Sequence, residues 1–162
     1  MQPEIQILQE KKLIGKSIKM SLAYNKTADL WKSFMPVRKE IANNLSTVLF
    51  SLQVYEKEYF ENFNPDNEFE KWALMEVSDF EAIPEGMKPF TLAAGLYAVF
   101  HYKGSSADHS VFDYIFQSWL PVSLYSLDNR PHFQVLGEKY KNSDPASEEE
   151  LWIPVKPKKS PE

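Results

Sequence analysis

The sequence predicts an α+β domain made of two similar strand–helix–strand–strand units, and an internal repeat is the main evidence. Residues 30–36 (LWKSFMP) match residues 115–121 (IFQSWLP) in class at every position: aliphatic, aromatic, polar, Ser, aromatic, aliphatic, Pro. A Gly-containing, strand-like run precedes each copy, and a Trp-bearing strand follows each. Two such halves favour a pseudo-twofold axis, mainly antiparallel strands and two principal helices. The seam between them is a natural place for a ligand.

In the first half, alternating and β-branched residues predict four strands. These are residues 4–8, 13–22, 47–55 and 71–78. Thr27 is positioned to cap a helix that carries Leu30 and Phe34 on one face. Pro36 should end or kink this helix, because the proline ring and its missing N–H disrupt the preceding turn. The acidic and aromatic stretch 57–68 is expected to be a loop.

The second half repeats this order. Its strands are expected at residues 90–102, 132–136 and 149–156. Ser105 and Asp108 have the spacing of a capping box at the start of a helix, and Pro121 should stop that helix. The helix carries apolar residues at helical spacing, so packing in the core is their expected role. They are Val111, Phe112, Ile115, Phe116 and Trp119.

Length and composition predict one folded domain over residues 1–157, with pseudo-repeats at about 4–80 and 88–157 and a flexible tail at 158–162. The chain has 162 residues, of which 43% are hydrophobic and 25% charged, a balance that supports a core. Aromatic residues make up 14%, enough for a large core or for a pocket that stacks flat or cationic ligands.

Several classes of function are disfavoured. With a net charge of −5, the chain gains no counterion-release affinity for phosphate backbones, so direct nucleic-acid binding is not expected. The absence of Cys excludes disulfides, thiolate metal sites and a Cys nucleophile. The three His lack zinc-site spacing and the five Gly are isolated, so no metal or cofactor is expected. Neither a signal peptide nor a membrane span is evident, and the cytoplasm is the expected location.

Five segments, taken together, resemble the GyrI-like effector-binding domains, also called AraC-type effector-binding domains or bacterial transcription-activator ligand-binding domains. They are residues 83–86 (IPEG), 94–100 (AGLYAVF), 119–121 (WLP), 130–135 (RPHFQV) and 150–155 (ELWIPV). The resemblance covers residues 1–157 and implies the tandem strand–helix–strand–strand fold. It also implies small-molecule binding in a cleft between the halves. Many relatives are fused to DNA-binding modules, whereas this chain resembles the stand-alone form.

The chain departs from the family at one position of chemical importance. The family commonly has a Phe-Glu-x-Tyr segment whose pocket Glu pairs with ligand cations, or acts as an acid/base in hydrolytic members. Here residues 133–136 read Phe-Gln-Val-Leu, so Gln134 stands where the resemblance places the Glu. An amide offers hydrogen bonds but no charge pairing and no titratable group. Gln134 is therefore expected to orient a ligand, and no catalytic residue is assigned.

Two other carboxylates are candidates for the charge that Gln134 lacks. Strand alternation puts Glu76 on the same face as Trp72, and Glu150 on the same face as Trp152. Each Glu either lines the cleft or lies at a strand end facing water.

The candidate ligand-binding aromatics are Trp72, Trp152, Tyr97, Trp119 and Tyr55. Trp72 and Trp152 occupy matching places in the two halves and could form facing walls. Tyr55 is preferred to Phe50, on the other face of the same strand, because a buried hydroxyl needs a hydrogen-bond partner and a ligand can be one. Core packing is the alternative for every one of them.

The sequence thus predicts a stand-alone domain that binds a lipophilic organic molecule, cationic or neutral, drug-like or a metabolite, and that acts in sensing or sequestration. The multidrug-binding relatives support this hypothesis by resemblance. A hydrolase of the family's cyclopropanoid type is one alternative. An inhibitor that binds a protein partner, as the gyrase-inhibitory relative suggests, is another, since an acidic surface can occupy the basic face of a DNA-binding protein.

Overall fold

The computed structural model describes residues 1–159, and the end of the predicted tail, residues 160–162, lies outside the described residues. The strands are β1 (Glu4–Leu8), β2 (Lys11–Ser21), β3 (Asn44–Val54), β4 (Glu68–Val77), β5 (Lys88–Leu92), β6 (Gly95–Lys103), β7 (Tyr125–Leu127), β8 (His132–Leu136) and β9 (Glu148–Pro157). The helical segments are α1 (Thr27–Phe34), η1 (Met35–Glu40), α2 (Ser110–Asp113), η2 (Tyr114–Trp119) and α3 (Leu120–Val122). None of these helices is long and apolar enough to cross a membrane.

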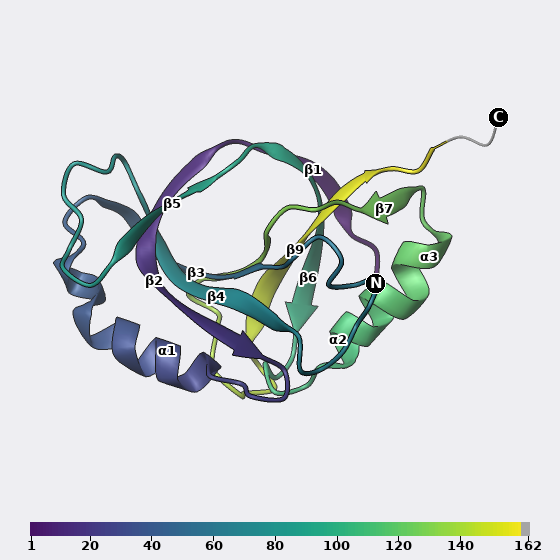
Figure 1. The fold of residues 1–162 in the computed structure, drawn as a ribbon, viewed down its shortest axis with the longest axis horizontal. Coiled ribbons are helices and arrows are strands. Elements are labelled where there is room, and N and C mark those ends of the chain that lie inside the picture. The colour runs from purple at the N-terminus through teal and green to yellow at the C-terminus, as the bar shows by residue number, and fades with distance from the viewer. Residues whose placement is uncertain (160–162) are drawn as a thin grey trace.

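The strands form one curled antiparallel sheet in the order β1-β6-β9-β8-β3-β4-β2-β5, with β7 paired to β9 (Figure 1). The first half contributes β2, α1, β3 and β4. The second half contributes β6, the helical run α2–η2–α3, β8 and β9. The halves meet at the β3–β8 ladder, where Ser51 lies opposite Gln134. The predicted α+β fold of two strand–helix–strand–strand units is therefore confirmed.

The two faces of the sheet have different cores, because successive residues of a strand point to opposite faces. The inner face, enclosed by the curl, buries an aromatic core that includes Phe50, Trp72, Tyr97 and Phe133. On the outer face, α1 covers the first half and α2–η2–α3 covers the second, each over its own apolar cluster (Figure 1). The centre of the outer face lies between the two helical segments.

The predicted single strand at 90–102 is wrong, because it is two strands that pair in different parts of the strand order. Residues 93 and 94 separate β5, which pairs with β2, from β6, which pairs with β1 and β9. The curl of the sheet brings these two ends of the strand order together, since Leu8 pairs with Gly95 and Lys11 pairs with Leu92. The break at Ala93 and Ala94 therefore lies where the chain passes from one end of the order to the other.

The predicted starts of the two helices also need correction. The N-cap of α1 is Lys26, and the Thr27 hydroxyl instead donates to Met20 Sδ at 3.5 Å. No capping box forms in the second half. Ser105 Oγ accepts from the N–H of Ala107 at 3.1 Å, and Asp108 Oδ1 accepts from the N–H of Ser110 at 3.0 Å. Each side chain therefore hydrogen-bonds within its own short turn and does not cap the helix, and α2 begins only at Ser110.

The two repeated prolines behave differently. Pro36 follows the end of α1 at Phe34, as predicted, and lies in the 3-10 segment η1. Pro121 lies inside the continuous helical run of residues 110–122, which ends one residue later at Val122. Its missing N–H leaves a carbonyl of the preceding turn without a helical partner, and the helix ends almost at once, close to where it was predicted to stop. Between α2 and α3 the chain forms the π-helical segment η2, a distortion that often accompanies functional sites.

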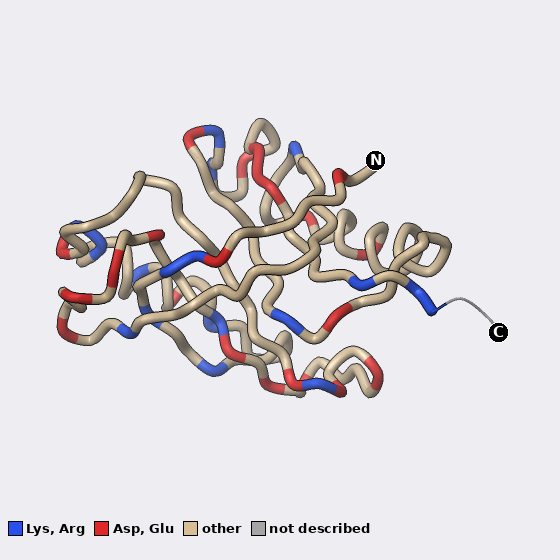
Figure 2. Tube along the Cα trace, turned by 90° about the horizontal axis from the view of Figure 1, so that it is seen from above, with Lys and Arg blue, Asp and Glu red and all other residues tan. Residues whose placement is uncertain are grey.

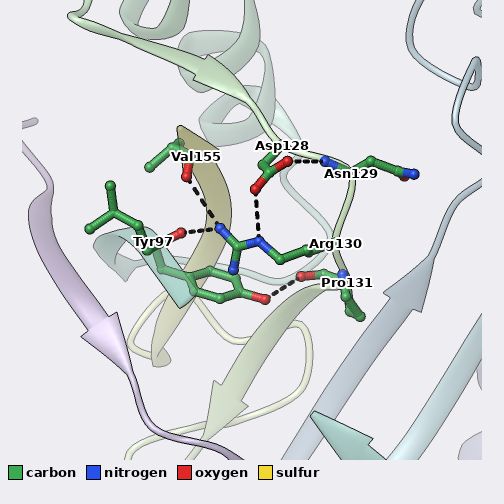
Figure 3. A network of polar contacts seen from close by, with 7 residues as sticks. Tyr97, Asp128, Asn129, Arg130, Pro131 and Val155 are labelled. Carbon is green, nitrogen blue, oxygen red and sulfur yellow. Dashed lines mark hydrogen bonds and ion pairs between the residues drawn. The ribbon is translucent and has the colours of Figure 1, made fainter. Parts of the chain in front are cut away.

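Arg130, in the turn before β8, contacts strands β6 and β9 (Figure 3). Its Nε donates to Asp128 Oδ2 at 2.9 Å, and its Nη2 donates to the carbonyl oxygens of Leu96 at 2.6 Å and Val155 at 3.2 Å. The guanidinium also lies 4.8 Å from the centre of the Tyr97 ring. These contacts tie β6 and β9 to the turn that leads into β8, and so set the position of that strand.

Candidate functional site

A cleft of about 1230 Å³ opens on the outer face of the sheet, between α1 of the first half and α2–η2 of the second. Its floor consists of the outward-pointing residues of the central strands. Its volume is comparable to that of large ligand pockets in proteins. The cleft lies at the seam between the two halves.

The side walls of the cleft are apolar and aromatic. Trp31 and Met35 line it from the α1 side, and Phe112 and Phe116 line it from the α2–η2 side. Each pair is four residues apart, the spacing that places side chains one above the other on a helix. The neighbouring residues Val111, Ile115 and Trp119 point away from the cleft into the core between helix and sheet.

The segment between β3 and β4, residues 55–67, closes one end of the cleft with aromatic rings. Phe60 stacks on Phe116 of the other half, with ring centres 5.4 Å apart, and on His132, with ring centres 5.2 Å apart. Tyr55 packs edge-on against Phe60 at 4.9 Å. Sequence reasoning treated this stretch only as a loop. The signal that could have identified it is Tyr59, Phe60 and Phe63 recurring among acidic and amide residues.

The floor of the cleft is polar at its centre. Gln53 of β3 and Gln134 of β8 face one another, with Gln53 Nε2 3.0 Å from Gln134 Oε1. In the orientation of the Gln53 amide that satisfies both of its ends, Oε1 accepts from Lys71 Nζ, and Nε2 donates to the carbonyl oxygen of His132 at 3.2 Å. Both glutamines are buried, so they form a rigid row of amide groups beneath the open space.

Two oppositely charged residues flank this row of amides. Lys71 of β4 is 9% exposed, and burial lowers the pKa of its ammonium from 10.5 to about 8, against the opposing effect of Glu149. Burial raises the pKa of Glu149 of β9, although Lys71 acts to lower it. Among residues 1–159, no carboxylate approaches Lys71 within 4 Å.

Two of the predicted ligand-binding residues, Gln134 and Tyr55, line the cleft. Gln134 is 8% exposed and belongs to its floor. Tyr55 belongs to the aromatic end, and burial raises the pKa of its hydroxyl above the ordinary range. Phe50, on the other face of the same strand, lies in the inner core, so the expected contrast between these two residues is found.

The other aromatic candidates lie in cores and not in the cleft lining. Trp72, Tyr97 and Trp152 pack on the inner face of the curled sheet, where Trp152 stacks on Phe133 at 5.2 Å. Trp119 packs beneath its helical segment, against Phe100. The expectation that Trp72 and Trp152 form facing walls of the cleft is wrong, because the curl encloses the face of the sheet that carries both.

Glu76 and Glu150 also lie outside the cleft lining. Glu76, near the end of β4, forms an ion pair with Lys11, whose Nζ lies 3.4 Å from Glu76 Oε2. Glu150 accepts from Trp152 Nε1 at 3.1 Å, so the two share a face as alternation predicts, but that face is the inner one. The residue of this strand pair that lines the cleft is the neighbouring Glu149.

The position of Tyr97 leads to a first testable prediction. Its hydroxyl donates to the carbonyl oxygen of Pro131 at 2.8 Å, and its ring is buried in the inner core. Tyr97→Phe should therefore lower the free energy of unfolding by about 1 kcal/mol, the usual net value of one hydrogen bond. Urea unfolding measures this loss. The variant should bind a cleft ligand as the wild type does, and a selective loss of binding at unchanged stability would contradict the assignment of Tyr97 to the core.

A curled antiparallel sheet with two helices on its outer face and a cleft at the junction of its halves is consistent with a GyrI-like fold. A family model described as integron-associated effector binding protein (Cass2) matches residues 4–155, and the chain belongs to that family. Among curated proteins, no match was found.

Several solved structures share the fold. SAV2435, in a structure with bound tetraphenylphosphonium, is 18% identical with a TM-score of 0.70, over 96% of this chain and 94% of that one. The C-terminal domain of EcmrR is 16% identical with a TM-score of 0.72, over 96% and 98%. An integron cassette protein from the mobile metagenome of Vibrio cholerae is 14% identical with a TM-score of 0.62, over 96% of each chain.

Proposed function

We propose that this protein binds a largely apolar organic molecule in the cleft between its two halves, and that it acts in sensing or sequestering that compound. The observation that carries the proposal is the composition of the cleft. Aromatic side walls from both helical segments enclose a small set of polar groups on a rigid floor, the combination typical of small-molecule sites.

The comparisons support this function. SAV2435 is a neighbour in fold whose structure contains tetraphenylphosphonium, a lipophilic ion, and the family itself is described as effector-binding. The charges of this chain do not suggest a surface for nucleic acid. Lys and Arg are interspersed with Asp and Glu along the described trace, instead of gathering into one basic face (Figure 2).

Phe60 is the best residue on which to test the site, because it touches both halves. It is 36% exposed, it lines the cleft, and it stacks on Phe116 and His132. Phe60→Ala removes an aromatic wall without removing a fully buried side chain. We expect the affinity for a cleft ligand to fall by about tenfold or more, as when an aromatic contact residue is truncated to Ala.

The measurement is a fluorescence titration with 1-pyrenemethanol, an uncharged polyaromatic probe, supported by a thermal-shift assay. Phe80→Ala is the matched control, because Phe80 is also a partly exposed Phe but packs beside α1, outside the cleft lining. Equal affinity of the Phe60→Ala and Phe80→Ala variants would place the binding site elsewhere. The absence of binding by 1-pyrenemethanol and by a broad panel of lipophiles would overturn the proposed function.

A further inference from the structure

We propose that the ligand of this cleft carries an acidic group, a carboxylate or an equivalent anionic oxygen, which binds Lys71 on the floor. The inference rests on the proposed function and specifies the chemistry of the ligand. The aromatic walls would then contact the apolar part of the ligand, and the positive charge of Lys71 on the floor would favour an anionic ligand over a cationic one.

The first observation is where the ammonium of Lys71 lies. Lys71 is at the centre of β4 and points to the outer face of the sheet, while its neighbour Trp72 points into the inner core. Its side chain is among the lining residues of the cleft although it is nine-tenths buried. A cation placed this way is shielded from bulk water but remains open to a ligand.

The second observation is that no carboxylate among residues 1–159 forms an ion pair with Lys71. An ammonium group has three N–H donors, and the only partner found among residues 1–159 is the Oε1 of Gln53. Burying a charge without an opposite charge is costly, so such groups are usually paired. An anionic oxygen above Lys71 would supply that missing charge and accept the free hydrogen bonds.

The third observation is the chemistry beside Lys71. The amide of Gln53 adjoins it and that of Gln134 follows, and each amide NH2 has two N–H donors, of which a contact within the floor uses one. The family's pocket carboxylate would repel an anion here, whereas Gln134 does not. Gln134, in place of the family's Glu, and the buried Lys71 therefore both favour an anionic ligand.

Glu149 lies beyond the two amides, on β9, and its negative charge disfavours an anionic ligand. It lines the cleft, and its attraction for Lys71 acts across more than 4 Å. Other titratable groups line the cleft from the segments that follow β3 and β8 and from the start of the second helical run. They are Tyr55, Tyr59, His109, Asp113, Glu138 and Tyr140. Among residues 1–159, Lys71 is the only Lys or Arg that lines the cleft, and it is more buried than the acidic residues there.

The test uses three probes with one aromatic scaffold: 1-pyrenecarboxylate, 1-pyrenemethanol and 1-pyrenemethylammonium, titrated by fluorescence at pH 7. We expect the acid to bind about tenfold or more tightly than the alcohol, because a charge-assisted hydrogen bond is stronger than a neutral one. The ammonium compound should bind most weakly.

Two substitutions test the contributions of the positive and the negative charge in the cleft separately. Lys71→Met should remove the preference for the acid and leave the affinity for the alcohol within about a factor of three, because the aromatic walls remain. Glu149→Gln should strengthen binding of the acid, because it removes a competing negative charge. Lys39→Met, which changes an exposed Lys outside the cleft, is the control and should behave as the wild type. Lys71→Gln provides a second, polar replacement.

The outcomes are distinct. If the alcohol binds and the acid has no advantage, or if Lys71→Met keeps the advantage, the inference is wrong while the proposed function stands. Tighter binding of the ammonium compound to the wild type, lost in Glu149→Gln, would assign the cleft to cations through Glu149. If none of the probes binds and a broad panel of lipophiles also fails, both the inference and the proposed function are overturned.

Discussion

Acidification is expected to destabilise this protein strongly through one residue, His132. Its imidazole is 4% exposed, and burial lowers its pKa from 6.5 to about 3. Between these values the unfolded chain takes up a proton that the folded chain does not, so stability is fully present above pH 6.5 and is lost as the pH falls towards 3. The loss should be about 1.4 kcal/mol per pH unit, or roughly 4 to 5 kcal/mol over the whole interval.

The surroundings of His132 explain the direction of the shift. Phe60 stacks on the ring and Tyr55 packs edge-on against it at 4.9 Å, and burial is the only cause of the lowered pKa. No carboxylate contributes to it. A protonated imidazole would have to enter an aromatic environment at the end of the cleft, so acid should also loosen the contact between the two halves.

Urea unfolding at several pH values between 7 and 4 tests this prediction. His132→Phe keeps a ring beside Phe60 but cannot titrate, so its stability should depend less on pH than that of the wild type. His101→Gln changes an exposed imidazole and serves as the control. Glu149 acts in the opposite direction, since a raised carboxyl pKa favours the fold at lower pH, but it is present in all three proteins. Parallel curves for the wild type and His132→Phe would show that the prediction is wrong.

The second large effect is a gain in stability when Lys71 is replaced. Burial lowers the pKa of Lys71 from 10.5 to about 8, which means that its ammonium group destabilises the fold at neutral pH. A shift of this size corresponds to about 3 kcal/mol, and the loss of the Gln53 hydrogen bond offsets about 1 kcal/mol of it. The free energy of unfolding of Lys71→Met should therefore be about 2 kcal/mol higher than that of the wild type at pH 7.

The pH dependence of this gain is its most specific feature. In the wild type, stability should rise between pH 8 and 10.5, because there the folded Lys71 has lost its proton while the unfolded one keeps it. The advantage of Lys71→Met should shrink over the same interval. Urea unfolding at pH 7 and pH 9.5 measures both values, with Lys39→Met as the control. A variant less stable than the wild type at pH 7 would mean that the ammonium is well solvated or paired. A stabilising substitution that removes selectivity for an acid would show that the buried charge is retained for binding.

Much of the architecture could be predicted from the order of residues alone. The repeated helix segments, the strands at β4 and β9, and the helix end before Pro36 follow from local periodicity and from the backbone chemistry of proline. These depend on neighbours in sequence, which is why the repeat indicated two equivalent halves and a seam between them. Gln134 was identified through resemblance to the family, and it does lie on the floor of the cleft.

The identity of the cleft face was decided only by the tertiary structure. Alternation in a strand separates Lys71 from Trp72 and Glu149 from Glu150, but it does not say which member of each pair faces a ligand. That depends on the direction in which the sheet curls and on the face that the helices cover. The curl encloses Trp72 and Trp152 in a core, while the helices stand apart over Lys71, Gln53 and Gln134. The aromatic end of the cleft likewise exists because Phe60 meets Phe116, a residue distant in the chain, and packing between distant segments leaves no local pattern in sequence.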